Sequence, residues 1–140
     1  MRIDVMPPYN PIIVPSAPID YPPNPNFGYS HPLKTLWKKG QLSQVRYGFY
    51  GELLTKRNLS LEHLKPISQK GKTEWNNLVL ASNKINNARG DKPLGEYLDL
   101  KAMARYLEQF KNIKVKGFNG NKYIAMILET VGGLLNAEKN

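Results

Sequence analysis

The stretch that decides the fold is LSLEHLKPISQKGKTEWNNLVLASNKINNARGD, residues 59–91. At its start Leu59, Leu61 and His63 fall on one face of an extended chain, and the residues between them fall on the other. This two-residue period is typical of a short strand. Pro66 is expected to end the strand, because proline has no backbone N–H to donate to a sheet.

The rest of this stretch predicts a second strand and a helix. A polar segment, KGKTEWNN, leads into the apolar run LVLA at 78–81, which has the length of a second short strand. Ser82 is a suitable N-cap for a helix over Asn83–Arg89, and Gly90 can end that helix. The predicted order is therefore strand, loop, strand and helix.

The region before this stretch is rich in proline. Nine of the eleven prolines lie within the first 32 residues, where they prevent a helix from propagating and exclude the chain from the interior of a sheet. We expect residues 1–33 to form an extended or disordered arm. The domain would then cover residues 34–140, with its core at 46–92.

The region after the core shows the spacing of amphipathic helices, with Asp99 as a plausible N-cap. Two apolar stripes at helical spacing follow. They consist of Leu100, Met103, Leu107 and Phe110, and then of Tyr123, Ile124, Ile127, Leu128, Val131, Leu134 and Leu135. We expect two helices, over about residues 94–138, to close over the small core, so the predicted fold class is α+β.

The length and composition exclude several classes to which the protein could belong. The chain has 140 residues and no cysteine, so we expect one domain with a real core and exclude disulfides and thiolate metal sites. It has no apolar run long enough to cross a bilayer. We therefore expect a soluble, cytoplasmic protein with no membrane partner.

The charge favours a polyanionic partner. The formal net charge is +9, and residues 34–72 hold nine lysines and arginines against two acidic residues. Such a concentration of positive charge favours nucleic acid ahead of an anionic membrane surface.

Polar residues of the deciding stretch are suited to the hydrolysis of a phosphodiester, which needs an activated water and positive charge near the phosphoryl oxygens. A neutral His63 can take the proton of the water near pH 7. Glu62 and Asn86 offer hard oxygen ligands of the kind that Mg²⁺ accepts. Because neighbouring strand residues point to opposite faces, Glu62 and His63 reach one phosphate only if the strand bends, and the break at Pro66 indicates such a bend.

Taken as a whole, residues 59–91 resemble the core of the HNH nuclease family. The family pattern is an acid-His pair, a proline and a serine just downstream, a glycine turn, Asn-Leu, and a final Asn-x-x-Lys/Arg-Gly-Asp. The matching residues are Glu62-His63, Pro66, Ser68, Gly71, Asn77-Leu78, Asn86 and Arg89-Gly90-Asp91. The resemblance implies a small ββα-metal fold and a metal-dependent endonuclease that acts on DNA.

The resemblance also implies roles for individual residues. His63 would be the general base, and Asn77 would hold the loop and the orientation of His63. Glu62 and Asn86 would bind one Mg²⁺ or Mn²⁺ ion, with Asn87 as the reserve candidate for Asn86.

Basic residues around this set would contact the substrate. By the same resemblance Arg89 would approach the DNA backbone or support the helix. Lys65, Lys70 and Lys72 are then interpreted as phosphate contacts beside the site.

The sequence departs from many HNH proteins in one respect. Two Cys-x-x-Cys pairs bind a structural zinc in those proteins, and the matching positions here are Tyr47, Tyr50, Ser82 and Ile85. We therefore expect no structural zinc. An apolar plug of Tyr47, Tyr50 and Ile85, helped by the C-terminal helices, is expected to replace its bracing.

Two other functions stay open at this point. The chain could be a nucleic-acid-binding protein with an HNH scaffold and no cleavage activity, or an adaptor that acts through its proline-rich arm. Sequence specificity, the choice between DNA and RNA, and the oligomeric state also stay open.

Overall fold

The computed structural model describes residues 31–139. The chain divides into two units, Met1–Pro32 and Leu33–Asn140, and the proline-rich arm predicted for residues 1–33 lies outside the described residues up to residue 30. Helix α1, Pro32–Lys38, begins within that predicted arm. Proline suits the first position of a helix, where its missing N–H would have no partner. The predicted arm, residues 1–33, therefore overlaps the start of α1.

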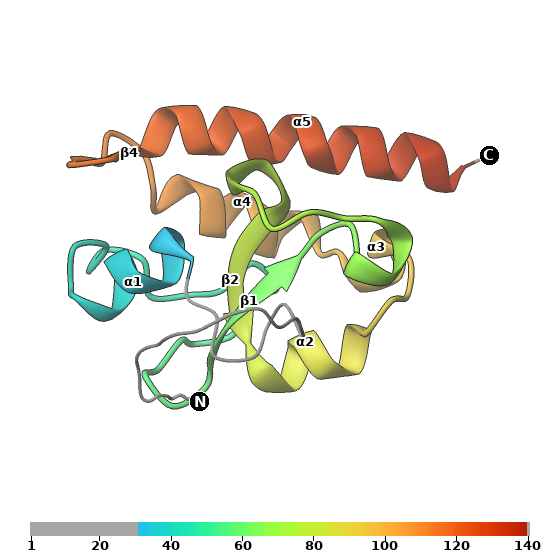
Figure 1. Ribbon diagram of the computed structural model, residues 1–140, viewed down its shortest axis with the longest axis horizontal. Coiled ribbons are helices and arrows are strands. Elements are labelled where there is room, and N and C mark those ends of the chain that lie inside the picture. Colours follow the sequence, from blue (N-terminus) through green and yellow to red (C-terminus); the bar gives the residue numbers. More distant parts are fainter. Residues whose placement is uncertain (1–30, 140) are drawn as a thin grey trace, which may run out of the picture. The chain divides into compact units, whose positions relative to one another are not determined.

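Residues 31–139 form five α-helices and two small antiparallel sheets, which confirms the α+β class (Figure 1). After α1 the elements in chain order are β1 (Leu59–His63), the 3-10 helices η1 (Ile67–Gln69) and η2 (Trp75–Asn77), β2 (Leu78–Ser82), α2 (Asn83–Arg89), α3 (Leu94–Tyr97), α4 (Leu100–Glu108), β3 (Lys114–Val115), β4 (Phe118–Asn119) and α5 (Gly120–Glu138). Among these residues no helix is both long and apolar enough to cross a membrane.

The two strands of the first sheet are the two that the sequence predicts. β1 and β2 pair antiparallel, from Leu59 opposite Ser82 to His63 opposite Leu78, and β2 includes one residue more than predicted. The Ser82 hydroxyl accepts a hydrogen bond from the first turn of α2, and Gly90 ends that helix with a φ of 56°. The predicted order of strand, loop, strand and helix is confirmed.

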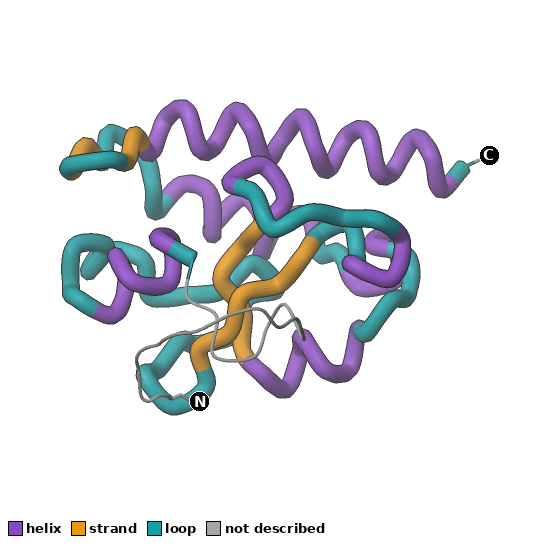
Figure 2. Tube along the Cα trace, in the orientation of Figure 1, coloured by secondary structure: helices purple, strands orange, loops and turns teal. Residues whose placement is uncertain are grey.

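The connection between β1 and β2 is mostly loop, with η1 and η2 as its two short helical turns (Figure 2). Gly71 is required at its tightest point, because a Cβ there would lie 1.7 Å from Lys65 O. The backbone N–H of Gly71 donates to Pro66 O (2.9 Å). The loop therefore folds back on itself directly after β1.

The outer edge of β2 is closed by two tyrosines from the helices that lie on that side of the hairpin in Figure 1. Tyr123 of α5 donates from its hydroxyl to Leu78 O (2.7 Å), and Leu80 N donates to the hydroxyl of Tyr106 in α4 (3.0 Å). The two hydroxyls lie 2.8 Å apart. Because an open strand edge leaves backbone groups unpaired, these phenols take the place of a third strand.

The turn before β1 closes the same edge further along. Phe49 N donates to Leu80 O (2.9 Å), and the Glu52 carboxylate accepts from Ser82 N (2.9 Å). The backbone groups of β2 that face away from β1 are thus bound to side chains and to a turn from other parts of the chain.

The C-terminal region contains more elements than the two helices predicted for it. α4 and α5 are the expected helices, and the structure adds the short helix α3 and the hairpin β3–β4. α3 is stabilised from a distance, because Glu138 near the end of α5 accepts hydrogen bonds from Leu94 N (2.7 Å) and Gly95 N (2.9 Å). A local pattern in the sequence does not reveal such support.

Asp99 is the N-cap of α4, as predicted, since its carboxylate accepts from the N–H groups of the first turn. The two predicted apolar stripes supply much of the core. Two of their members are exceptions, because Leu100 is 63% exposed and Leu128 is 48% exposed. Leu128 follows the buried Ile127 by about 100° around the helix, which turns it away from the packed face.

Candidate functional site

Glu62 lies in the interior and not on an open surface. Its side chain on β1 is 2% exposed. One carboxylate oxygen, Oε2, forms an ion pair with Arg89 Nη1 at 2.9 Å and also accepts a short hydrogen bond from the Tyr50 hydroxyl. The negative charge of Glu62 is therefore compensated inside the protein.

The pKa of the Glu62 carboxyl is raised, and burial is the main cause. Hydrogen bonds from Tyr50 and the positive charge of Arg89 lower that pKa in part, while the charge of Glu52 raises it further. Burial and the neighbouring Glu62 charge also raise the pKa of Tyr50 far above its usual range. Tyr50 therefore remains a hydrogen-bond donor to Glu62 at neutral pH.

Asn86 is placed against β1 by the first turns of α2. Its Nδ2 donates to Ser60 Oγ (2.8 Å) and to Leu61 O (3.1 Å). Within residues 31–139 no donor is bonded to its Oδ1, which leaves this oxygen as an acceptor. The neighbouring Asn87 is exposed, so Asn86 rather than Asn87 lies beside β1.

Arg89, one turn after Asn86, is also buried, with 1% of its side chain exposed. In addition to Glu62 it binds two backbone carbonyls, with Nη1 3.1 Å from His63 O and Nε 3.0 Å from Lys92 O. Of the two roles that the sequence left open for Arg89, these contacts match support of the helix. A side chain so deeply buried does not reach a phosphate at the surface.

His63 faces the other side of the strand. Its Nε2 lies 2.9 Å from Thr73 Oγ1 in the loop, and its side chain is 9% exposed. The bend expected near Pro66 has not begun at His63, because Leu64 N still pairs with Asn77 O (2.9 Å). Since the strand is regular here, the Glu62 carboxylate and the His63 imidazole point to opposite faces.

Asn77 closes the loop that follows β1. Its Oδ1 accepts from Lys65 N (2.8 Å), and its Nδ2 donates to Lys65 O (3.0 Å) and to Lys72 O (2.9 Å). The amide thus ties both ends of the segment 65–72 to the start of β2. Thr73, the partner of His63, is the next residue along the same segment.

The three predicted phosphate contacts lie together. Lys65, Lys70 and Lys72 are exposed and line a shallow pocket of about 420 Å³ beside Asn77. Glu74 contributes one negative charge to the same pocket. The structure therefore brings the lysines together on the loop that Asn77 closes, whereas Arg89 lies apart from them inside the protein.

The expected apolar plug is not formed as predicted. Tyr47 lies under the guanidinium of Arg105, at 4.4 Å from the ring centre, and neither Tyr47 nor Ile85 belongs to the core. Tyr50 packs against the core but directs its hydroxyl to Glu62.

Sequence reasoning missed several residues of this site. Thr73 and Glu52 had no assigned role, and Tyr50 was expected to be apolar packing. The positions of Tyr50 and Glu62, 12 residues apart, follow from the turn before β1, which carries no helix or strand period. The hydroxyl on the Tyr50 ring is the signal that could have indicated a hydrogen-bond partner.

The donor atoms around Asn86 fit a hard divalent ion in part. No group of three or more His, Cys, Asp or Glu side chains suited to a metal occurs in the described part of the chain. Mg²⁺, however, is commonly held by one or two carboxylates, with waters and substrate phosphates as its remaining ligands. The Asn86 amide oxygen can be one ligand, whereas the buried Glu62 carboxylate would bind an ion only if it became accessible and gave up part of its contact with Arg89.

No family model matches the chain, and neither a curated protein nor a solved structure matches it.

Proposed function

We propose that this protein is a metal-dependent endonuclease of the HNH type, which hydrolyses DNA phosphodiester bonds beside β1, β2 and α2. The observation that carries the proposal is the loop closed by Asn77. It exposes three lysines around one pocket, and it carries Thr73, which is hydrogen-bonded to His63. A candidate base is thus hydrogen-bonded to the loop that carries three candidate phosphate contacts.

In the proposed reaction the oxygen of a water forms a bond to phosphorus while one P–O ester bond breaks. His63 takes the proton of the water, and the leaving oxygen takes a proton from solvent. A base in this position contributes typically about 10²–10⁴ in rate. The lysines hold the phosphates on either side and keep the strand in place.

Glu62 and Asn86 would hold the divalent ion. When bound, such an ion supplies positive charge opposite the charge that builds up on the phosphoryl oxygens. Because Glu62 is paired with Arg89, we expect the Arg89 guanidinium to shift toward its carbonyl partners when the ion is present. For Glu62 and His63 to act on one phosphate, the end of β1 would also have to bend when substrate binds, because the two side chains point to opposite faces of the strand.

Nicking of supercoiled plasmid tests the proposal. With Mg²⁺ or Mn²⁺ the protein should convert the plasmid to open circles or linear DNA, and EDTA should stop the reaction. His63→Ala should lower the rate by roughly 10²–10⁴. An absence of cleavage, or undiminished cleavage by His63→Ala, would overturn the proposal.

Asn86→Ala and Asn87→Ala form a matched pair for the metal assignment. The two residues are neighbours on α2, and the same atoms are removed from each. Asn86→Ala should raise the metal concentration needed for nicking, whereas Asn87→Ala should not, because Asn87 faces solvent. Equal effects of the two substitutions would contradict the assignment of Asn86.

A second function is favoured by the ion pair itself. Because Glu62 is already neutralised by Arg89 and bonded to Tyr50, the same scaffold can bind nucleic acid without cutting it. Such a protein would bind duplex DNA in EDTA and would leave plasmid intact at every metal concentration.

The salt dependence of DNA binding tests whether the lysines contact phosphates, whether or not the protein cuts DNA. Each phosphate that a lysine neutralises on duplex DNA adds about −0.9 to the slope of log K against log salt. The double variant Lys70→Gln/Lys72→Gln should therefore show a slope that is less steep by about 1.8. An unchanged slope would remove these lysines from the interface.

A further inference from the structure

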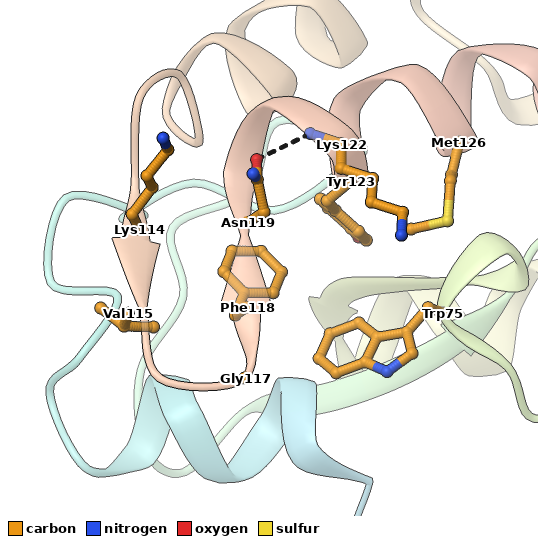
Figure 3. Close-up of a pocket in the computed structure, with 9 residues that line it drawn as sticks. All are labelled: Trp75, Lys114, Val115, Gly117, Phe118, Asn119, Lys122, Tyr123 and Met126. Carbon is orange, nitrogen blue, oxygen red and sulfur yellow. Dashed lines mark hydrogen bonds between the residues drawn. The ribbon is translucent and has the colours of Figure 1, made fainter.

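A second pocket lies beside the candidate site, between η2, the hairpin β3–β4 and the first turns of α5. Its volume is about 520 Å³ (Figure 3). Trp75 forms one side, Phe118 and Val115 form the other, and Tyr123 and Met126 lie along α5. A volume of this size is within the range of pockets that bind small flat molecules.

The walls of this pocket are aromatic. The rings of Trp75 and Phe118 lie 5.4 Å apart, centre to centre, and are inclined by 37°. Phe118 lies 5.6 Å from Tyr123. Phe118 and Tyr123 are buried and belong to the core, whereas Trp75 is half-buried and packs against the core. Phe118 therefore covers part of the indole, and another ring can stack only on the part of Trp75 that stays exposed.

The rim of this pocket is positively charged. Lys114 and Lys122 are among the residues that line it, and both are exposed. In Figure 3 the Lys122 side chain extends along α5 toward Met126, while that of Lys114 extends away from the rings. None of the nine lining residues is acidic. An aromatic interior with a cationic rim matches a ligand that is a flat ring joined to an anion.

Trp75 is also joined to the candidate site by a short and well-held segment. Thr73, the partner of His63, precedes Trp75 by two residues, which span at most about 7 Å. η2 is fixed to α5, because the Thr130 hydroxyl donates to Asn76 O (2.6 Å). A nucleic-acid strand bound at the lysine pocket would therefore run close to the segment that carries the indole.

From these contacts we infer that the pocket receives an unpaired base of the bound DNA strand, with its phosphate at Lys122 on the rim. The inference rests on the proposed function for its choice of DNA as the ligand. It adds a substrate class, which is a duplex with a single-stranded tail or gap next to the site. Stacking on an aromatic side chain tolerates any base, so no sequence preference follows from this pocket.

Binding can be tested apart from cleavage. We would use the full chain carrying His63→Ala, in EDTA, and follow fluorescence anisotropy of a blunt duplex and of the same duplex with a short thymidine tail. The tailed duplex should bind about 10-fold more tightly, as one stacked base provides. An identical tail of abasic nucleotides, which keeps the phosphates, should lose that advantage.

Two substitutions localise the effect. Trp75→Leu should bring the tailed duplex to the affinity of the blunt one. Lys122→Gln should weaken binding of the tail, and Lys101→Gln is its matched control, because both lysines are exposed and each donates its backbone N–H to the N-cap side chain of a helix. Lys101→Gln should leave the tail advantage unchanged.

The outcomes separate this inference from the proposed function. An abasic tail that binds as well as the base-bearing tail would overturn the pocket inference, and so would a full tail advantage in Trp75→Leu. An absence of any DNA binding would overturn it as well. If the tail advantage depends on Trp75 but plasmid is never cut, the pocket inference stands and the endonuclease proposal fails.

Discussion

The two outer edges of the β1–β2 hairpin are closed in chemically different ways. At β1, Leu61 O and His63 O accept from Asn86 and Arg89 of α2. At β2, the matching groups are bound by neutral phenols from α4 and α5, by a backbone turn, and by Glu52. Beside the β1 edge lies the Glu62–Arg89 ion pair, which a bound ion or a proton can disrupt. The phenols on β2 are uncharged and are suited to holding the fold.

Loss of the charge on the β1 edge should have the largest effect on stability. Arg89→Met leaves the Glu62 carboxylate buried without its ion partner, which costs about 3–5 kcal/mol of the free energy of unfolding. Urea denaturation measures this. Lys84→Met, an exposed change on the same helix, is the control, and the double variant Glu62→Gln/Arg89→Met should recover part of the loss. A cost below about 1 kcal/mol for Arg89→Met would mean that this edge is not held by charge.

Disruption of the loop that joins β1 to β2 should have the second largest effect on the free energy of unfolding. Asn77→Ala removes three hydrogen bonds to backbone groups of the segment 65–72, and we expect a cost of about 2–3 kcal/mol. Amide hydrogen exchange should show faster opening of that segment, with α4 and α5 unaffected. Asn76→Ala, at the exposed neighbouring position, should stay within about 0.5 kcal/mol of the unsubstituted protein. Equal effects at the two positions would contradict the role of the Asn77 amide.

Alkaline pH should act on three buried phenols, Tyr50 beside Glu62 and the two phenols of the β2 edge. Burial raises the pKa of Tyr50, Tyr106 and Tyr123 above the usual value near 10. Above about pH 10 the unfolded chain releases these protons and the folded chain keeps them, so stability is full below that pH and is lost as the pH rises. Each of the three phenols should lower the free energy of unfolding by about 1.4 kcal/mol per pH unit. Urea denaturation at a series of pH values measures this slope.

Substitution of Tyr106 or Tyr123 by phenylalanine tests whether these two side chains contribute to the loss of stability at alkaline pH. Tyr106→Phe and Tyr123→Phe should each make the slope less steep by one proton. The same variants lose hydrogen bonds to β2, so they should be less stable at neutral pH. A slope that does not change in either variant would show that these phenols do not retain their protons in the folded state.

Removal of the N-cap of α2, the Ser82 hydroxyl, should have the smallest effect on the free energy of unfolding. Ser82→Ala removes the hydroxyl that accepts from Ile85 N (3.3 Å) but keeps the backbone contact with Glu52. Loss of such a cap costs about 1 kcal/mol. A cost as large as that of Arg89→Met would indicate that Ser82 carries the contact between β2 and the turn, and not only the cap.

The same comparison explains what the sequence predicts and what it does not. β1, β2 and α2 have local signals, namely alternation, an apolar run, a serine cap and a terminal glycine, and all three were predicted. The burial of Arg89 depends on Glu62, 27 residues away, and an arginine in the last turn of a short helix has the pattern of a surface residue. Similarly, the hairpin β3–β4 has two residues in each strand, too few for a period to be detected.

The candidate site divides in the same way. The positions of Glu62, His63, Asn77 and Asn86 in the motif were available from the sequence, but the direction of each side chain was not. Direction depends on whether β1 bends, and the pairing of Leu64 with Asn77 is a contact across the loop that no spacing rule contains. Whether the four residues perform the proposed reaction is left to the nicking assay.

Because the residues that cover the β2 edge come late in the sequence, this edge is exposed for a time while the chain is being synthesised. LVLAS is an apolar strand, and its two covering phenols come much later, with Tyr106 26 residues after Leu80 and Tyr123 45 residues after Leu78. During synthesis, β2 therefore leaves the ribosome well before the groups that shield it. Uncovered apolar strands pair readily with other chains. The interval before α5 is complete is the stage at which this chain most needs a chaperone or rapid synthesis.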